Sequence, residues 1–423
     1  MAKKIYIHRE IEGILKKVVN QFPALVVTGP RQSGKSTLLK ELFSKDYAYI
    51  SFDDPVTRER AISDPEFFLD SLEEKVIIDE IQYVPQLLSY VKLRIDRKRQ
   101  KRGNFIFTGS QQFNMIKNLG DTLAGRIAIM ELLPFSLKEK EKVFKKKDKF
   151  VTAQKYFTHS CLRGSFPEIV VYDYIDAELW YSSYEQTYLE RDVRTFYNIG
   201  NLRDFQRFIQ ILAARCSQVL NLSSLSSALG VAVNTIKKWI SILEATRIIY
   251  LLKPYYQNLG KRITKSPKLY FLDNGLLCYL LSLKDRDYLL KGPMAGALFE
   301  NFCVQETIKT IFNQGKTPKL YYIRTHNGLE IDMLIEKKGQ LFPVEYKLTK
   351  TPTLDMGKSI KRFRKLFSRV KIMPGRIISM SDKNIPLARD LSVQSIDDYL
   401  KWMRKIHGAG NQNTSNKMNS SRE

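Results

Sequence analysis

The sequence predicts an α/β protein of about three domains, and three observations predict it. A β-branched run (24–27), a glycine-bounded loop and a helical pattern follow one another near the N-terminus. Further apolar runs at 76–78 and 105–107 alternate with helical segments, which is typical of a sheet covered by helices. Near the C-terminus, two strand-like runs are joined by a short turn at 337–340. A chain of 423 residues is long enough for several hydrophobic cores.

The loop after the first strand, TGPRQSGKST (28–37), is the most specific motif of the chain. Glycine permits backbone angles that turn successive amides toward phosphate oxygens, and the following helix adds its unpaired N–H groups. Lys35 is expected to reach the β- and γ-phosphates, and Ser36 to ligate Mg²⁺. The simpler alternative is a glycine-bearing turn. We predict an ATP site made by Gly29, Pro30, Arg31, Gln32, Ser33, Gly34, Lys35, Ser36 and Thr37.

Two later strands are expected to complete this site. The run KVIIDEIQ (75–82) ends in two acids, of which Asp79 would order Mg²⁺ through its water shell and Glu80 would polarise the attacking water. The next strand, FIFTGS, ends at Ser110, which is expected to sense the γ-phosphate, with Thr108 as the alternative. This placement follows because ligands of such sheets bind beyond the carboxyl ends of the strands.

The charge balance points to an anionic partner. The chain has 69 Lys+Arg against 44 Asp+Glu, a formal charge of +25, which favours nucleic acid or an anionic membrane surface, or is spread over solvating lysines. Four scattered cysteines and four histidines argue against zinc and fit a reducing cytosol. The longest uncharged apolar run, 275–283, is about half a membrane span. We therefore expect a soluble, cytoplasmic protein that does not bind membranes.

Residues 137–150 form a charge run without a sustained apolar face, which favours a solvated helix or linker over a nucleic-acid contact. Farther along, residues 221–246 read as two helices divided at Gly230, the second capped by Asn234, and two strands follow. This order predicts a winged helix whose second helix presents Lys237 and Lys238 outward to DNA. The alternative is a winged helix that serves only as a protein-packing module.

The C-terminal third contains a second group of chemical side chains. Asp332 lies in one predicted strand, and Glu345 and Lys347 lie two apart in the next, so their side chains share one face of the sheet. A helix over 296–312 offers Glu300 as a further acid. One alternative is a hairpin whose charges face solvent.

The order of the phosphate loop, IIDEIQ, FIFTGS, LAGR and LLPFSL resembles prokaryotic AAA+ ATPases that carry a nuclease-like C-terminal domain. The resemblance implies that Arg126 is an arginine finger, which reaches the γ-phosphate on a neighbouring subunit of a homo-oligomer. The alternatives are a surface arginine or an internal ion pair. The turn RGSFPE resembles one that related ATPases place near the adenine, which implies nucleotide contacts for Gly164 and Pro167.

The acid followed by Glu-x-Lys resembles the PD-(D/E)XK nuclease core. In that core, carboxylates hold a divalent metal, and a lysine orients water against a phosphodiester. The resemblance implies a second metal held by Glu300, Asp332 and Glu345, with Lys347, Asp332 and Glu345 as catalytic residues. Ile331 stands where the motif has proline. An alternative is a nuclease-like fold that is chemically idle.

These expectations divide the chain into five parts. They are an ATPase core (1–150), a helical lid (151–203), a winged-helix module (204–273), a restriction-endonuclease-like domain (274–400) and a largely disordered polar tail (401–423). We expect ATP binding and hydrolysis coupled to DNA binding. The alternative is an ATP-driven assembly or signalling switch whose C-terminal domain is an idle docking module.

Overall fold

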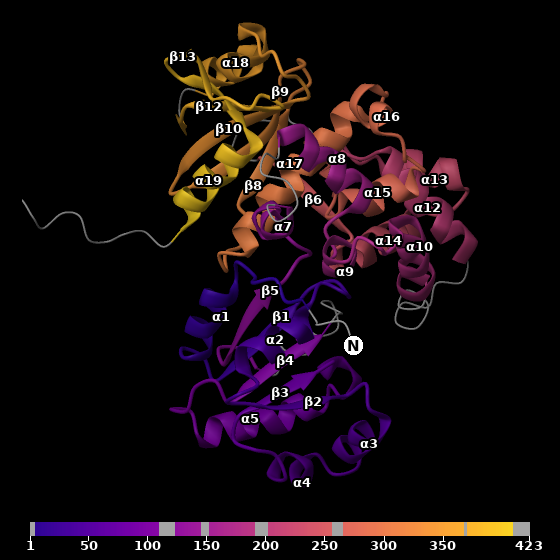
Figure 1. Cartoon of the computed structure of the whole chain (residues 1–423), viewed down its shortest axis with the longest axis vertical. Helices are drawn as coiled ribbons and strands as arrows, with labels where there is room; N and C mark the ends of the chain where they lie inside the picture. Colours follow the sequence, from indigo (N-terminus) through magenta and orange to yellow (C-terminus); the bar gives the residue numbers. More distant parts are fainter. Residues whose placement is uncertain are drawn as a thin grey trace, which may run out of the picture.

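Two β-sheets organise the protein, and helices cover both (Figure 1). The computed structural model describes residues 5–109, 123–144, 152–190, 202–255, 265–367 and 370–408. The first sheet has five strands in the order β2-β3-β4-β1-β5, and all its pairs are parallel. Its strands are β1 (Ala24–Thr28), β2 (Ala48–Ser51), β3 (Val76–Asp79), β4 (Phe105–Gly109) and β5 (Ile127–Glu131).

Helices cover both faces of this parallel sheet, as the alternating pattern predicted. Alternate residues of β1 face different cores, Leu25 and Val27 on one side and Val26 on the other. Because all five strands run the same way, the carboxyl ends of β1, β3 and β4 meet at one edge. The helices of this part are α1 (Glu12–Val19), α2 (Lys35–Phe43), α3 (Pro55–Ser63), α4 (Pro65–Asp70), the 3₁₀ turn η1 (Ile81–Tyr83) and α5 (Leu87–Arg97).

A helical region follows β5, and its first helix contains buried charged residues. The helix α7 (Leu137–Phe144) carries Glu139 and Lys140, whose side chains are completely buried. The expectation of a solvated helix or linker is therefore wrong for this helix, because both charges find partners inside the protein. The region continues with α8 (Ala153–Arg163), α9 (Pro167–Val171), α10 (Ala177–Tyr184) and the π-helical turn η2 (Glu185–Glu190).

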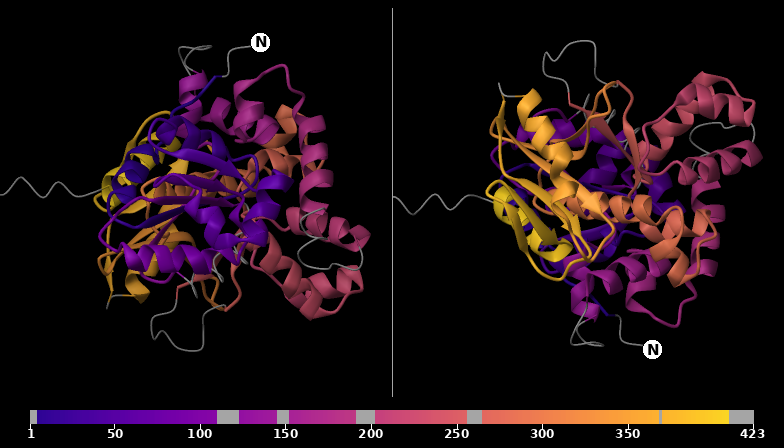
Figure 2. Two further views of the ribbon diagram at one scale, coloured as in Figure 1. Left: turned by 90° about the horizontal axis from the view of Figure 1, so that it is seen from below. Right: turned by 90° about the horizontal axis from the view of Figure 1, so that it is seen from above.

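The two helices predicted around Gly230 are present. Asn221 caps the first by accepting a hydrogen bond from the Ser224 backbone N–H, and Gly230 ends it in a left-handed conformation. The second helix begins at Val233, so Asn234 lies inside its first turn and the prediction of Asn234 as the cap is wrong. This region comprises α12 (Leu202–Ala214), α13 (Leu222–Leu229), α14 (Val233–Ala245), β6 (Ile249–Pro254) and β7 (Lys268–Phe271), and α12 to α14 stand to one side of both sheets (Figure 2).

The second sheet is mixed, with strand order β13-β14-β12-β10-β9-β8-β6-β7 and β11 paired beside β10. The β9–β10 hairpin turns at Lys338 and Gly339, both with positive φ, within the short turn expected at 337–340. Its further strands are β8 (Leu320–Arg324), β9 (Glu330–Lys337), β10 (Gln340–Lys347), β11 (Lys371–Ile372), β12 (Gly375–Ser379), β13 (Ile385–Ala388) and β14 (Leu391–Ser395). The helices are α15 (Asn274–Leu280), α16 (Arg286–Lys291), α17 (Ala295–Phe312), η3 (Leu354–Gly357), α18 (Lys358–Leu366) and α19 (Ile396–His407).

The structure differs from the expected division after residue 150. Strand β6 pairs in parallel with β8, so the strands of the expected wing belong to the sheet of the C-terminal domain. One hydrophobic core also joins Phe157, Phe208, Leu243 and Phe302, which lie in three of the expected units. These units therefore pack as one body. The helix α19 reaches His407, beyond the boundary expected at residue 400, because its apolar face packs into this core.

Among the described residues, no helix combines the length and apolar character needed to cross a bilayer. The apolar run at 275–283 contributes instead to α15, most of whose side chains are buried in the core.

Candidate active site

The loop between β1 and α2 has the backbone shape that a phosphate cradle requires. Gly29, Gln32 and Gly34 have φ of 144°, 56° and 90°. A Cβ atom at Gly29 would lie 2.1 Å from the carbonyl oxygen of Leu132, so only glycine fits this close approach. The Ser33 hydroxyl is buried and has no hydrogen-bond partner within the described chain. A buried, unused hydroxyl in a loop of this shape fits an oxyanion ligand.

Lys35 begins α2 and supplies a buried cation to this loop. Its ammonium donates hydrogen bonds to the carbonyl oxygens of Gly29 (3.0 Å) and Pro30 (2.9 Å), and its side chain is 5% exposed. Burial lowers the pKa of Lys35 to about 8, although the nearby Glu80 and Asp79 carboxylates oppose the fall. No carboxylate in the described parts of the chain forms an ion pair with it. A buried ammonium in this state is poised for an anion.

The side chains of Asp79 and Ser36 both lie near the hydroxyl of Tyr49. Asp79, at the end of β3, accepts hydrogen bonds from the hydroxyls of Thr108 on β4 and Tyr49 on β2. Burial and Asp79 together raise the pKa of the Tyr49 hydroxyl, although Ser36 lies close enough to that hydroxyl to lower its pKa. The two residues predicted to coordinate Mg²⁺ thus lie around a single small polar position, and their oxygen atoms are the ligands that this ion prefers. The arrangement fits Mg²⁺.

Sequence reasoning missed Tyr49, since a tyrosine in a short edge strand carries no motif. Thr108, considered there as a γ-phosphate sensor, instead directs its hydroxyl to Asp79. Ser110, the preferred sensor, lies outside the described residues.

Glu80 stands immediately after β3 in an unusual conformation. Its φ of 57° is rare for a residue with a side chain and carries a conformational cost. The amide of Gln82 donates a hydrogen bond to its carboxylate. Of the two acids near Lys35, Glu80 raises the lysine pKa more than Asp79 does, which is consistent with a carboxylate close to the phosphate loop. This position suits a carboxylate that orients water near a phosphate.

Arg126 precedes β5, an edge strand of the parallel sheet, as the motif order predicted. Its guanidinium forms two hydrogen bonds with the Asp96 carboxylate, at 2.7 and 3.0 Å. These hydrogen bonds from Arg126 lower the pKa of Asp96. Within one chain, Arg126 therefore makes an internal ion pair, which was the alternative to an arginine finger.

Gly164 and Pro167 are placed differently. A Cβ atom at Gly34 would lie 3.6 Å from Cγ of Pro167, so Pro167 packs against the phosphate loop. A Cβ atom at Gly164 would instead collide with the hydroxyl of Tyr181 and the carboxylate of Asp273. Gly164 therefore permits the close packing of α8, α10 and α15.

Arg9, which no motif indicated, contacts the phosphate loop directly. Its guanidinium donates to the carbonyl oxygens of Ser33 (2.8 Å) and Leu133 (2.6 Å) and to the Glu139 carboxylate (2.9 Å). Both Arg9 and Glu139 are buried, and the guanidinium lies over the Phe135 ring. A buried arginine thus ties the loop to β5 and α7.

The acids predicted for the C-terminal domain come together with two lysines. The Lys347 ammonium lies 2.8 Å from the Glu345 carboxylate and 3.7 Å from that of Asp332, so these side chains share one face. Glu300 on α17 accepts a hydrogen bond from the Tyr270 hydroxyl at 2.6 Å. Lys268 lies 3.3 Å from Glu300.

This acidic cluster differs from the predicted metal site. Burial, followed by the charge of Asp332, raises the pKa of Glu300 to about 7 and that of Glu345 well above its usual range. Burial alone would lower the pKa of Lys268, yet the surrounding carboxylates raise it. In the described residues, no group of three His, Cys, Asp or Glu side chains has the geometry to hold a metal ion. The expected second metal does not fit the cluster.

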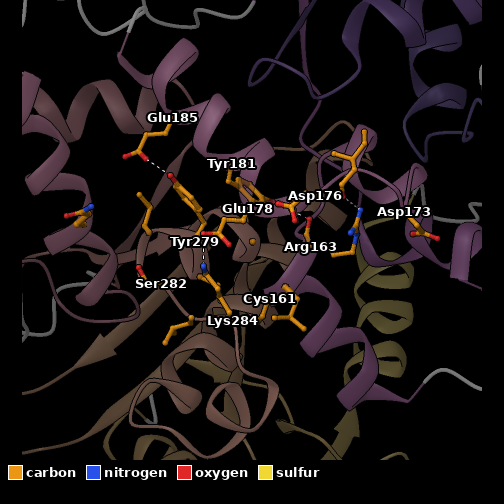
Figure 3. A pocket seen from close by; sticks show the side chains of 18 of the residues that line it. Cys161, Arg163, Asp173, Asp176, Glu178, Tyr181, Glu185, Tyr279, Ser282 and Lys284 are labelled. Carbon is orange, nitrogen blue, oxygen red and sulfur yellow. Dashed lines mark hydrogen bonds and ion pairs between the residues drawn. The ribbon is translucent and has the colours of Figure 1, made fainter.

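A separate cavity of about 690 Å³ opens among α8, α10, α12 and α15 (Figure 3). In it, the Tyr279 hydroxyl donates to Glu185 (3.0 Å) and the Lys284 ammonium to Glu178 (2.6 Å). Its lining contains no residue of the phosphate loop. Because several of its charged groups are already paired, the cavity does not indicate a particular ligand.

Three family models match successive parts of the chain. Residues 21–141 match an AAA domain, and residues 154–287 and 295–399 match two domains of unknown function (DUF8612 and DUF4143). An uncharacterized protein of Mycobacterium tuberculosis is 28% identical over 403 residues, which cover 94% of this chain and 87% of the relative. An uncharacterized protein of Methanocaldococcus jannaschii is 27% identical over 406 residues, which cover 88% of this chain and 84% of the relative.

Among solved structures, the Walker-type ATPase of Pyrococcus abyssi is 16% identical, with a TM-score of 0.45, and covers 65% of this chain and 96% of its own. The Thermotoga maritima RuvB Holliday junction branch migration motor is 16% identical, with a TM-score of 0.29. The match covers 57% of this chain and 88% of the RuvB chain. The match to the AAA domain agrees with the glycine loop and the parallel sheet described above. Residues 21–141 therefore match an AAA domain and have the parallel α/β core of a P-loop NTPase.

Proposed function

We propose that the protein binds and hydrolyses ATP and transmits its nucleotide state to the body formed by the rest of the chain. The observation that carries this proposal is the contact of Arg9 with both the phosphate loop and α7. Lys35 binds the terminal phosphates, while Ser36 and Asp79 would hold Mg²⁺, which supplies charge neutralisation at the phosphates. Glu80 orients the attacking water.

The route from the loop continues through buried hydrogen bonds. Glu139 accepts from the backbone N–H of Ser136, and the neighbouring Leu137 N–H donates to Glu306 on α17 at 2.6 Å. Glu306 pairs with Lys309 at 3.0 Å, and both side chains are completely buried. A movement that separates a buried charge from its partner costs roughly several kcal/mol, so these paired side chains must move together. A shift of the phosphate loop is therefore expected to move α7 and α17 together.

Hydrogen exchange tests this proposal. A slowly hydrolysed ATP analogue with Mg²⁺ should increase the protection of amides in α7 and α17 of the native chain, and Lys35→Ala should abolish the change. Glu80→Gln should show the same increase in protection when ATP replaces the analogue, because it should still bind ATP. It should hydrolyse ATP far more slowly than the native chain. Unchanged exchange in α7 and α17 on nucleotide binding would contradict the coupling, while the hydrolysis assay would still test the ATPase.

DNA is the second candidate partner, and the surface of α14 favours it. Asn234, Lys237 and Lys238 are exposed on this helix, as predicted for a helix that enters a groove, and the chain carries a charge of +25. A contact of this kind neutralises backbone phosphates and releases counterions, so binding should weaken steeply with salt.

Reversal of the two α14 charges should weaken DNA binding. In the variant Lys237→Glu/Lys238→Glu, we expect duplex affinity at low salt to fall about tenfold or more, with a shallower salt dependence, because phosphate contacts are lost. Fluorescence anisotropy at several salt concentrations measures this. Lys45→Glu, on an exposed surface of the ATPase domain, is the matched control. Equal affinity of the α14 variant and the native chain would exclude this surface.

Assembly with ATP at a subunit interface rests on Arg126. The pair with Asp96 must open for Arg126 to reach a neighbouring subunit, and solvent screening keeps an exposed ion pair of this kind weak. We therefore expect the hydrolysis rate per chain to rise with protein concentration and Arg126→Ala to abolish this rise. Asp96→Ala is expected to preserve or enhance it. A rate per chain independent of concentration would exclude Arg126 as a residue acting in trans.

A further inference from the structure

Lys268 reaches the acidic cluster of the C-terminal domain from outside the hairpin that carries the Glu-x-Lys motif. It begins β7, where its backbone bridges to Val219 and the neighbouring Pro267 carbonyl accepts a hydrogen bond from the Leu220 N–H. The residue is 2% exposed, so its long side chain is enclosed. Its position is therefore fixed by the packing of β7 between two regions of the chain.

The Lys268 ammonium is shared by three carboxylates. It lies 2.6 Å from Glu330, 3.3 Å from Glu300 and 3.8 Å from Asp332. A second ammonium, from Lys347, lies between Asp332 and Glu345. Each of the three acids predicted to hold a divalent metal is thus paired with a lysine.

The Lys268 ammonium occupies the position among the carboxylates that a bound metal ion would need. A divalent ion in such a cluster would need several carboxylate oxygens turned toward one point, with free coordination positions. Here the oxygens of Glu300 and Asp332 face the Lys268 ammonium, and Asp332 also accepts the Tyr346 backbone N–H at 3.0 Å. A metal ion at the same point would meet a positive charge that the fold cannot move into solvent.

We propose that Lys268 takes the place of a divalent metal ion in this cluster. The cluster then stabilises the sheet as a network of ion pairs, and the domain does not cleave phosphodiesters through Asp332, Glu345 and Lys347. Lys268 is the residue that distinguishes this network from a metal site, because its removal leaves Glu300, Glu330 and Asp332 facing one another with one cation fewer.

The experiment measures Mn²⁺ binding to the full chain without nucleotide, by calorimetry and by thermal melting. The native protein should show no binding at this cluster, and a chelator should leave its melting temperature unchanged. Lys268→Met should melt at a lower temperature because it leaves buried carboxylates unpaired. Added Mn²⁺ should raise that temperature again. Lys265→Met, an exposed lysine three residues earlier, should behave as the native chain does.

The added variant Asp332→Asn assigns any binding to the cluster. In the Lys268→Met background it should remove the Mn²⁺-dependent rise in melting temperature. Nucleotide-independent Mn²⁺ binding by the native chain that Asp332→Asn abolishes would overturn the proposal. So would a folded Lys268→Met that gains no affinity for Mn²⁺. If Lys268→Met does not fold, the comparison of the native chain with Asp332→Asn still decides the question.

Discussion

Replacement of Lys35 by methionine is expected to weaken ATP binding about a hundredfold while making the ligand-free protein more stable. The ammonium is the buried cation of the phosphate loop, and its charged hydrogen bonds to phosphate are worth about 3 kcal/mol together, or roughly a hundredfold in Kd. Without ligand the same charge destabilises the folded protein, because the ammonium is buried and donates to only two carbonyl oxygens. One substitution therefore moves the two properties in opposite directions.

The pKa of Lys35 sets the pH range of the stability effect. Its value falls from 10.5 in the unfolded chain to about 8 in the folded protein, so the folded state disfavours the proton. The penalty is fully present below pH 8 and disappears as pH rises to about 10.5. It amounts to about 3 kcal/mol at neutral pH, to order of magnitude. The stability of the native apoprotein should rise over this range relative to that of Lys35→Met.

Thermal melting with and without Mg-ATP measures both effects. At pH 7 we expect Lys35→Met to melt higher than the native chain without nucleotide and to gain much less stability from ATP than the native chain gains. The exposed Lys45→Met is the control and should keep the ATP-dependent rise. An undiminished rise with ATP in Lys35→Met would refute the assignment of the phosphate loop.

Local patterns predicted the elements that carry the ATP site. A β-branched run, two glycines and a helical repeat specify β1, the loop and α2 without information from elsewhere, because the strain at Gly29 and Gly34 is resolved by the residue type itself. The hairpin at Lys338 and Gly339 follows for the same reason. In each case the physical determinant lies within a few residues of the feature.

Long-range pairing is what the sequence could not reveal. Glu139 and Lys140 lie in a run that looks solvated, yet Glu139 is paired with Arg9, 130 residues away, and Lys140 donates to Ser160 at 2.6 Å. Lys268 likewise belongs to a predicted wing but neutralises acids of another predicted domain. A charge pattern shows that charges exist but not which of them will be desolvated together. For that reason it missed the residues that join the ATPase domain to the rest of the chain.

Arg9→Ala is expected to have the second large effect, and it would act at that junction. It removes three hydrogen bonds and leaves the Glu139 carboxylate buried without its cation. Loss of one partner of a buried ion pair costs about 3–5 kcal/mol. We expect a marked fall in melting temperature and a loss of nucleotide-dependent protection in α17. Arg94→Ala, which breaks a partly exposed ion pair with Asp70 in the ATPase domain, should lower stability much less.

A double variant separates stability from transmission. Arg9→Met/Glu139→Gln removes both charges, so no buried ion is left unpaired and the free energy of unfolding should recover much of the loss. The three contacts of the guanidinium remain absent, since methionine cannot donate to Ser33 or Leu133. Because the loop and α7 then no longer share a rigid polar link, ATP should still bind but should not change hydrogen exchange in α17. Native-like, ATP-dependent protection of α17 in this double variant would show that the coupling runs through other contacts, such as the Arg247–Glu131 ion pair between β5 and the end of α14.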